Sequence, residues 1–378
     1  MNSRKILQFS QGQIQTPAFL PDATLGVVRS LDSLDLSRCG IQALVMNTFH
    51  LMQRPGSSTV RALGGLHEMT GWQGPLVTDS GGFQVFSLIR ENVKYGTIND
   101  RGIFFQPEAS ARKFRITPEK IIQLQLSFQT NVLICLDDCT HPDDSLAVQL
   151  ISVERTIAWA RRCKKTFDQL VNQKEFSAKE RPLLFAVIQG GNSHELRKRC
   201  AGELLEIGFD GFGFGGWPFD SDRNLLIDMI GYTRELVPLA IPMHALGIGH
   251  PRTVVAVSKL GYDLFDSALP TRDARQGRLY SLNDDFSFAN DDWDENWFSY
   301  LYINDKKYIK SDYPVFPSCD CHCCTNYSVG YLHHLFKIND GLFLRLSTIH
   351  NLRFMALLTK KLRAEDSEPE MFPQTSVG

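Results

Sequence analysis

The chain has 378 residues, of which 43% are hydrophobic and 22% charged, as in a globular protein large enough to bury a core. Forty basic residues against 42 acidic ones give a formal charge of -2, so a nucleic-acid site must be a local basic patch. The first residues lack the apolar core of a signal peptide, and no apolar run is as long as a membrane span. We therefore expect a cytoplasmic protein without a transmembrane segment.

Eight apolar runs of strand length recur along the chain, and each is followed by a segment of helical length or periodicity. They lie at 16–23, 41–49, 76–82, 132–139, 183–191, 209–216, 244–249 and 262–270. Strands that are continuously apolar suit a parallel sheet covered by helices. Eight such units predict a (β/α)₈ barrel, and we assign it to residues 1–280.

Three helices are predicted in some detail between these strands. Thr117, Pro118 and Glu119 have the residue types of an N-cap, a first helical position and a first turn. Residues 145–171 form a long amphipathic pattern, and a further helix is predicted at 222–236.

An open, doubly wound sheet is the rival fold, because "GFGFGG" at 211–216 matches the G-x-G-x-x-G spelling of a dinucleotide site. The match is weak. It lies in the sixth unit, the segment after it is a poor helix start, and no strand ending in an acidic residue follows at the expected distance.

The carboxyl ends of barrel strands carry catalytic groups, and five of the predicted ends carry a polar side chain or glycine. These residues are Asp79, Asp137, Asp138, Gln189, Gly215, Gly216 and Asp266. Any one aspartate could shape a turn, cap a helix or pair with an arginine. Together they predict one polar mouth, where two carboxylates on separate strands can divide the work of glycosyl transfer.

Several further motifs occur in order along the chain: "NTFHLMQRPG", "TDSGGFQVFSL", "IQGG", "GFDGFGFGG", "FDSALPTRDARQG", "CDCHCC" and a later "IHN". As a set they resemble the motifs of one family, the bacterial-type tRNA-guanine transglycosylases, or queuine/preQ1 tRNA-ribosyltransferases. The resemblance spans nearly the whole chain. It implies a pentosyltransferase that exchanges the wobble guanine of tRNAs with a G-U-N anticodon for a 7-deazaguanine, in queuosine biosynthesis. It also implies a homodimer.

The resemblance assigns roles to particular residues. Asp266 corresponds to the nucleophile that holds the ribose covalently, Asp79 to the general acid/base, and Asn47 to a residue that orients the nucleophile. The positions expected to bind the base are Ser80, Phe83, Asp137, Gln189, Gly216 and Leu246. Phe83 would stack on the base and Leu246 would line its other face, although either could be ordinary core packing.

Two arginines, Arg272 and Arg275, match residues that meet the anticodon of the tRNA. The planar fork of arginine suits both phosphates and base edges. The alternative is that one of them pairs internally with Asp266 or Asp273.

The wall that would recognise the substituent of the 7-deazaguanine departs from the family pattern. In "GGWPFDSDR", Trp217 replaces a leucine, and no glutamate follows. Cys139 and the bulk of Phe219 favour preQ1 as the entering base.

Three alternative functions remain open. They are a queuine-using salvage enzyme, a paralogue that inserts a 7-deazaguanine into DNA, and a non-catalytic tRNA-binding partner subunit. The presence of both Asp79 and Asp266 disfavours the last.

Four of the nine cysteines crowd into "CDCHCC" at 319–324. In a reducing compartment such density favours tetrahedral zinc, but spacing leaves several ligand sets open. The competitors are Cys323, His322, His333, His334 and His350. The family pattern selects Cys319, Cys321, Cys324 and His350, which implies one structural Zn²⁺ per chain. The rival, an independent nucleic-acid-binding finger, lacks a C₂H₂ loop of the usual length.

We assign residues 281–363 to a zinc-binding subdomain with closing helices. Residues 364–378 are polar and contain proline, which predicts a disordered tail. The acidic, aromatic segment at 284–297 would repel phosphate if it faced the tRNA, and the sequence assigns it no function.

Overall fold

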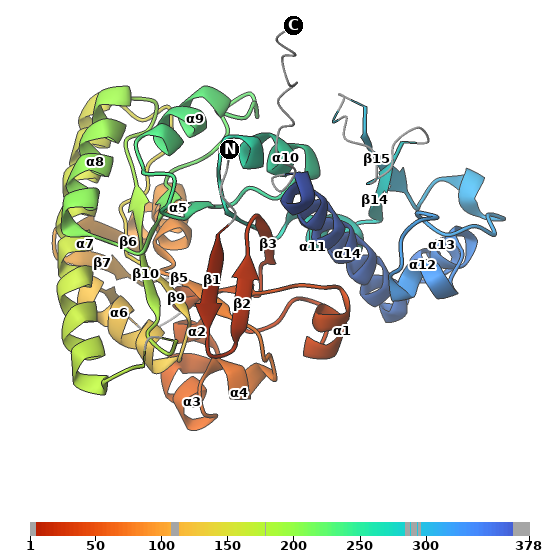
Figure 1. Ribbon diagram of the computed structural model, residues 1–378, viewed down its shortest axis with the longest axis horizontal. Coiled ribbons are helices and arrows are strands. Elements are labelled where there is room, and N and C mark those ends of the chain that lie inside the picture. Colours follow the sequence, from red (N-terminus) through yellow and green to blue (C-terminus); the bar gives the residue numbers. More distant parts are fainter. Residues whose placement is uncertain are drawn as a thin grey trace, which may run out of the picture.

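The computed structural model describes residues 5–106, 113–177, 179–283, 288, 293 and 296–365. Its centre is a parallel sheet of eight strands, in the order β3-β13-β12-β11-β10-β9-β5-β4 (Figure 1). The strands are β3 (Ala18–Pro21), β4 (Leu44–Asn47), β5 (Leu76–Asp79), β9 (Val132–Ile134), β10 (Leu183–Ile188), β11 (Gly211–Phe214), β12 (Met243–Ala245) and β13 (Leu264–Ser267). Each lies within one of the eight predicted runs or overlaps it.

The sheet closes on itself, because its two end strands meet. Asp22, directly after β3, forms a parallel bridge with Val45 of β4. The backbone N–H of Ala23 donates a 2.7 Å hydrogen bond to the carbonyl of Val45. The predicted (β/α)₈ barrel is therefore confirmed, and the "GFGFGG" segment belongs to its sixth strand, β11.

Helices surround this barrel. They are α1 (Ser33–Arg38), α2 (Thr48–Leu51), the π-helix η1 (Met52–Gly56), α3 (Ser57–Ala62), α4 (Leu66–Thr70), α5 (Gly82–Glu91), the 3₁₀ helix η2 (Val93–Tyr95), α6 (Pro118–Ser127), α7 (Leu146–Lys174), α8 (His194–Ile207), α9 (Ile227–Glu235), α10 (Pro251–Lys259) and α11 (Leu269–Arg275). Thr117 caps α6 as predicted, since its side chain accepts from the N–H of Lys120 at 3.3 Å.

The predicted helix at 222–236 is wrong at its start. The helix α9 begins only at Ile227, because the preceding residues form a turn in which Phe219 bridges to Leu225. Arg223 has a φ of 67°, in the left-handed region, and the side chain of Asp220 accepts from the N–H of Asn224 at 2.8 Å. This local hydrogen bonding competes with the first helical turn.

Alternation along the strands divides the core in two. The interior of the barrel is filled by one cluster, Ala18, Leu20, Ala43, Val45, Val77, Val132, Ile134, Phe185, Val187 and Leu264. The N-terminal hairpin of β1 (Ile6–Phe9) and β2 (Gly12–Gln15) adds Leu7, Phe9 and Ile14 to the same cluster. The intervening strand residues pack outward against the helices. Since side chains alternate along a strand, this pattern fixes which residues face the barrel axis.

Two smaller sheets accompany the barrel. One contains β6 (Gly96–Asn99), β7 (Gly102–Phe105) and β8 (Phe114–Ile116), inserted between α5 and α6. The other pairs β14 (Arg278–Leu282) with β15 (Phe298–Tyr302) and is followed by η3 (Lys306–Tyr308), α12 (His322–Asn326) and α13 (Val329–Lys337). The acidic segment at 284–297 lies almost entirely outside the described residues.

The long C-terminal helix α14 (Gly341–Glu365) separates these last elements from the barrel in Figure 1. It packs on β3, α10 and α11, so it completes the helical layer. Arg345 of α14 also forms a bidentate pair with the buried Asp35 of α1, at 2.6 and 2.8 Å.

The predicted tail begins too early, because Ala364 and Glu365 belong to α14. The rest of the predicted tail lies outside the described residues. Among the described helices, none is both long and apolar enough to cross a membrane.

Candidate active site at the barrel mouth

Polar residues at the strand ends point into the barrel, because each lies two positions after an inward apolar residue. The pairs are Val45 and Asn47, Val77 and Asp79, Val187 and Gln189, and Leu264 and Asp266. Side chains two residues apart share one face of a strand. The carboxyl ends of four different strands therefore bring these groups to one mouth.

Asp79, at the end of β5, is a partly buried carboxyl group with a raised pKa. Burial, and next the charge of Asp266, raise its pKa from 3.8 to about 6. Asn47 is its direct partner in the register of β4 and β5, and the Asn47 amide donates to Asp79 Oδ2 at 3.1 Å. The predicted orienting residue thus contacts the predicted acid/base, and among the described residues its side chain has no hydrogen bond to Asp266.

The turn after Asp79 depends on its glycines. Gly81 has a φ of 83°, and a Cβ at this position would lie 2.3 Å from that of Phe49. The buried Ser80 accepts a hydrogen bond from the N–H of Gly82 at 3.3 Å. A side chain at residue 81 is therefore excluded by both conformation and space.

Asp266, at the end of β13, is held through one of its two carboxylate oxygens. The backbone N–H of Gly247 donates to its Oδ1 at 3.0 Å. Nε2 of His244, a fully buried residue of β12, lies 2.9 Å from the same oxygen. Asp22, directly after β3, also has a raised pKa. Burial is the main cause, and the nearby charge of Asp266 adds to it.

Asp137 and Gln189, two of the predicted base-binding residues, contact each other. The Gln189 amide donates to Asp137 Oδ2 at 2.7 Å, and both side chains are buried. Burial and the charge of Asp79 raise the pKa of Asp137 to about 7. A Cβ at Gly215 would lie 2.6 Å from Gln189 Nε2, so this backbone can approach the pair only as glycine. Asp138 instead forms an ion pair with Arg155.

Aromatic rings stand beside this polar pair. The ring of Trp217 lies 5.2 Å from that of Phe83 and 5.8 Å from that of His141. Trp217 is 38% exposed, which is unusual for a tryptophan outside an interface or site. Leu246 packs on the barrel interior, and Gly216 adopts a φ of 88° next to Trp217.

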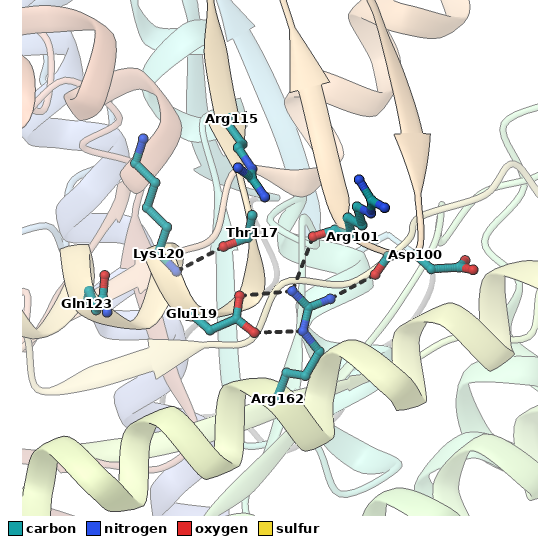
Figure 2. Close-up of a pocket in the computed structure, with 8 residues that line it drawn as sticks. All are labelled: Asp100, Arg101, Arg115, Thr117, Glu119, Lys120, Gln123 and Arg162. Carbon is teal, nitrogen blue, oxygen red and sulfur yellow. Dashed lines mark hydrogen bonds and ion pairs between the residues drawn. The ribbon is translucent and has the colours of Figure 1, made fainter.

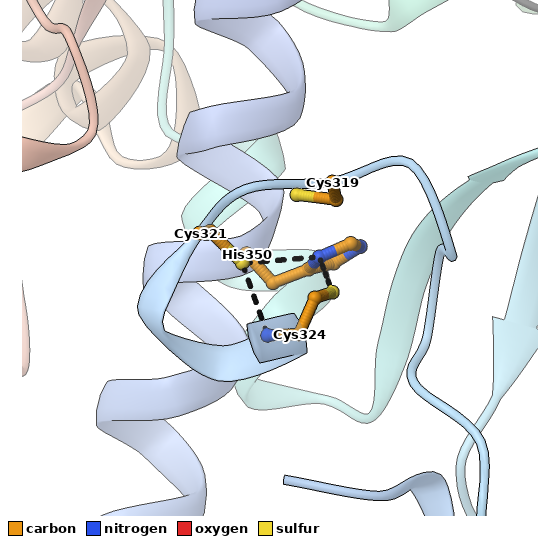
Figure 3. Close-up of side chains that lie close together, drawn as sticks. All are labelled: Cys319, Cys321, Cys324 and His350. Carbon is orange, nitrogen blue, oxygen red and sulfur yellow. Dashed lines mark hydrogen bonds between the residues drawn. The ribbon is translucent and has the colours of Figure 1, made fainter. Parts of the chain in front are cut away.

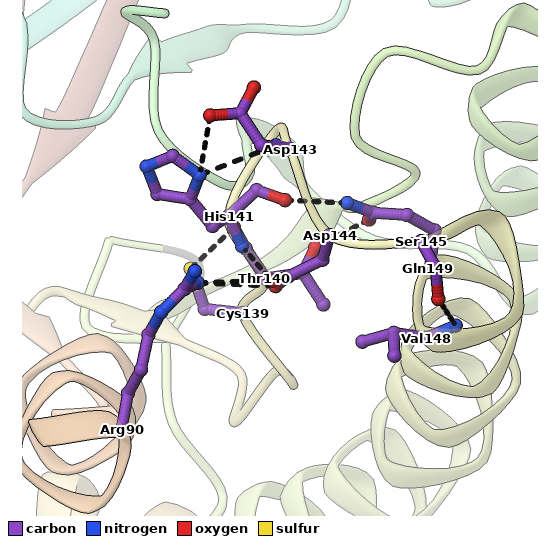
Figure 4. Close-up of polar contacts among 9 residues, drawn as sticks. All are labelled: Arg90, Cys139, Thr140, His141, Asp143, Asp144, Ser145, Val148 and Gln149. Atoms are coloured by element: carbon purple, nitrogen blue, oxygen red, sulfur yellow. Dashed lines mark hydrogen bonds and ion pairs between the residues drawn. The ribbon is translucent and has the colours of Figure 1, made fainter. Parts of the chain in front are cut away.

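The loop after β9, which carries Cys139 and His141, is fixed by a polar network (Figure 4). Gln149 of α7 donates to the carbonyl of His141 at 2.7 Å, and Asp144 accepts from the N–H of His141 at 2.8 Å. Arg90 of α5 pairs with Asp144 at 3.2 Å. The wall against Trp217 is therefore held by two separate helices.

Arg272 and Arg275 lie on α11, directly after β13. Asp273 forms an ion pair with Arg278 at 2.5 Å, and Asp266 lies 2.9 Å from His244. Within the described residues, neither predicted tRNA-binding arginine has an ion pair. Arg272 is exposed, whereas Arg275 is half-buried and its Nη1 atom is buried without a hydrogen-bond partner among the described residues.

The C-terminal cysteines form a compact cluster with a histidine (Figure 3). The ligand atoms of Cys319, Cys321, Cys324 and His350 all lie within 4.8 Å of one another, and all four residues are buried. A tetrahedral zinc with bonds of about 2.0–2.3 Å separates its ligand atoms by roughly 3.5–3.8 Å, which this set can match. Cys323 is not part of the cluster.

The chemistry of the cluster also suits a metal. His350 Nε2 lies 2.7 Å from the carbonyl of Tyr280, so this nitrogen carries the proton and Nδ1 faces Cys321 and Cys324. Hydrogen bonding from Cys319 lowers the pKa values of Cys321 and Cys324, that of Cys324 to about 5, while the same contacts raise the pKa of Cys319 and the neighbouring thiols raise that of His350. Three cysteines and one histidine are a usual ligand set of structural zinc, so the residues present fit this ion.

Comparisons with known proteins agree with this arrangement. A family model described as queuine tRNA-ribosyltransferase matches residues 4–369. The chain belongs to this family. The proteins named queuine tRNA-ribosyltransferase in Actinobacillus pleuropneumoniae and Halothermothrix orenii are each 35% identical to it, over 93% and 96% of this chain and 85% and 89% of their own. The one in Solidesulfovibrio magneticus is 34% identical over 94% of this chain and 88% of its own.

The queuine tRNA-ribosyltransferase family consists of pentosyltransferases, so the chain belongs to a family of enzymes. This membership confirms the resemblance inferred from the motifs.

A separate pocket of about 580 Å³ lies outside the barrel (Figure 2). Its lining includes four cationic residues, but Arg162 is held by Glu119 at 2.7 and 2.9 Å and donates to the carbonyls of Asp100 and Arg101. None of the predicted site residues lines it. We regard it as a structural junction between α6, α7 and the β6–β8 sheet.

Three residues near the mouth were missed by the sequence reasoning. Asp22 and His244 lie on predicted strands and face inward, so alternation from Leu20 and Leu246 could have found them. Arg197 is a buried arginine of α8 whose guanidinium donates to the carbonyls of Ile188, Gly191 and Gly215 at 2.6–3.0 Å. It ties together the ends of β10 and β11, and no local sequence signal marks it.

Proposed function

We propose that this enzyme exchanges the wobble guanine of G-U-N anticodon tRNAs for a 7-deazaguanine through a covalent ribosyl–Asp266 intermediate. The observation that carries the proposal is the pair of carboxylates, Asp79 and Asp266, brought from separate strands to one barrel mouth. Their charges interact, and the pKa of Asp79 is raised to about 6. A group that must both give and take a proton works best when its pKa lies near the working pH.

The reaction consists of two displacements at C1′ of the ribose. A carboxylate oxygen of Asp266 forms a bond to C1′ while the bond from C1′ to N9 of guanine breaks, and Asp79 gives its proton to the departing base. The entering base then gives its proton to Asp79, its N9 attacks C1′, and the bond to Asp266 breaks. Two inversions retain the configuration of the sugar.

Base recognition would rest on Asp137, Gln189 and the backbone at Gly216. The carboxyl and amide groups offer donors and acceptors to a planar heterocycle, with Phe83 and Leu246 on its faces. We favour preQ1 over queuine as the entering base. The ring of Trp217, which lies 5.8 Å from that of His141, would crowd a larger substituent that extended toward this wall.

The remaining assignments follow from the family and from chemistry. We propose that the cluster of Cys319, Cys321, Cys324 and His350 holds one structural Zn²⁺, since four protein ligands leave no open position for a substrate. The zinc would stiffen residues 281–363 beside the catalytic unit at 1–280. We also propose that the protein is a cytoplasmic homodimer and that it binds tRNA beside Arg272 and Arg275.

Exchange assays test the function directly. Purified protein is offered labelled guanine, preQ1 and queuine with tRNA transcripts or duplex DNA, and we expect incorporation into G-U-N tRNA, with preQ1 used best. Wild-type protein should give a protein–RNA adduct that survives denaturing electrophoresis. Asp266→Asn should give neither exchange nor adduct, and an adduct retained by this variant would exclude Asp266 as the nucleophile.

A further inference from the structure

His244 is a buried histidine that the reaction described above does not use. It lies on β12 between Met243 and Ala245, which pack outward, so its own side chain points into the barrel. It is fully buried, and its Nε2 lies 2.9 Å from Asp266 Oδ1. The carboxylates that face it from the other strands include Asp79, whose pKa it helps to hold down.

Packing alone does not explain a histidine at this position. Within the described residues, neither ring nitrogen makes an aligned hydrogen bond, and both are buried. Buried polar atoms without partners destabilise a fold, so an apolar side chain would serve the core better. Hydrogen bonds of catalytic groups often become aligned only when the substrate is bound. The 2.9 Å distance between His244 Nε2 and Asp266 Oδ1 is therefore the contact that indicates a role.

The two oxygens of Asp266 are not equivalent. Oδ1 accepts the N–H of Gly247 at 3.0 Å and lies 2.9 Å from His244 Nε2, whereas Oδ2 accepts no hydrogen bond from the described residues. Gly247 and His244 belong to β12 and the turn after it. A hydrogen-bonded carboxylate oxygen is the weaker nucleophile, so Oδ2 is left as the atom with an available lone pair.

We propose that His244 is a positioning residue that, together with the Gly247 N–H, holds Asp266 Oδ1 so that Oδ2 attacks the ribose. This inference rests on the proposed role of Asp266 as the nucleophile. In the first displacement the Oδ2–C1′ bond forms as C1′–N9 breaks, and in the second it breaks again. The Nε2–H of His244 stays on the ring throughout, and it stabilises the carboxylate that leaves in the second step.

A matched pair of variants tests the role. His244→Gln and His244→Met both carry unbranched side chains of similar length, but only glutamine places an N–H donor near the position of Nε2. We expect His244→Met to slow adduct formation and kcat by on the order of 10- to 100-fold, as for loss of a hydrogen bond to a charged group. His244→Gln should stay within a few-fold of wild type. KM for tRNA should change little in either variant.

Thermal unfolding separates positioning from structure. His244→Met should melt close to the wild-type temperature, because neither ring nitrogen has an aligned hydrogen bond to lose. Equal activity of the methionine and glutamine variants, at whatever level, would overturn the inference. Asp266→Asn, assayed beside them, distinguishes the two proposals. An adduct in Asp266→Asn would exclude Asp266 as the nucleophile. An adduct that depends on Asp266 but forms at the wild-type rate in His244→Met would exclude only the role of His244.

Discussion

The amide of Asn47 donates a 3.1 Å hydrogen bond to Oδ2 of Asp79, across two strands in which these residues are direct register partners. The same side chain uses its oxygen to accept the N–H of His50 at 3.1 Å, as the N-cap of α2. Asn47 therefore fixes the carboxyl group and the loop beside it at once. Its two contacts can be separated by mutation.

We predict that Asn47→Ser lowers exchange about 10-fold, by the loss of one hydrogen bond to a charged group, while leaving stability nearly unchanged. Serine is a good N-cap but is too short to reach Asp79. Asn47→Ala should lose the same activity and a further ~1 kcal/mol of unfolding free energy, measured with denaturant. Wild-type activity in Asn47→Ser would show that the contact does not orient Asp79.

The pKa of Asp79 predicts a pH-dependent stability. Below about pH 4 this group is protonated in the folded and unfolded chain alike. As the pH rises to about 6, the unfolded chain loses the proton while the folded chain retains it, so stability is lost over this window. Asp79→Asn should therefore be more stable than wild type at pH 8, by up to about 3 kcal/mol, and not at pH 4.

Denaturant unfolding at both pH values measures this difference, and exchange by Asp79→Asn should be absent. Asp312→Asn, at an exposed aspartate, serves as the control and should match wild type at each pH. An Asp79→Asn variant equally stabilised at pH 4 and pH 8 would contradict the assignment of a raised pKa.

Arg272 should contribute to tRNA binding through charge. We expect Arg272→Ala to weaken binding several-fold at low salt and to reduce the slope of log affinity against log salt by about 1, as for one lost phosphate contact. Arg199→Ala, at an arginine of α8 that pairs with Glu154 and Glu203, is the control and should leave the slope unchanged. Equal slopes for all three proteins would exclude a contact of Arg272 with phosphate.

Trp217 should restrict the size of the entering base. Replacing it with alanine removes the ring between Phe83 and His141, so we expect Trp217→Ala to accept queuine better relative to preQ1. Exchange of guanine for guanine, which carries no such substituent, should be affected least. Competition assays with the three bases measure the ratio, and an unchanged preference would place the substituent elsewhere.

Cys321 and Cys323 offer a matched test of the metal site. Both are buried, but only Cys321 belongs to the four-ligand cluster. Elemental analysis should give about one zinc per chain in wild type and Cys323→Ala, and much less in Cys321→Ala, whose melting temperature should also fall. Full metal content in Cys321→Ala would shift the site to other ligands.

The sequence by itself determined the number and position of the barrel strands, because continuous apolar runs and strand length are local properties. It also placed Asp79, Gln189 and Asp266 at strand ends. The start of α9 could not be predicted in this way. A turn stabilised by Asp220 and Asn224 replaced the expected first helical residues.

Only the tertiary structure decided which of these groups meet. That Asn47 contacts Asp79, that His244 lies against Asp266, and that His350 joins three cysteines follow from strand register and from the packing of α14, which link residues far apart in the chain. The alternation of residues along a strand predicts which face of the sheet a side chain takes. It does not predict which side chain of another strand lies next to it. Closure of the barrel buries Asp79 and brings the charge of Asp266 near it, and together these raise the pKa of Asp79 to about 6.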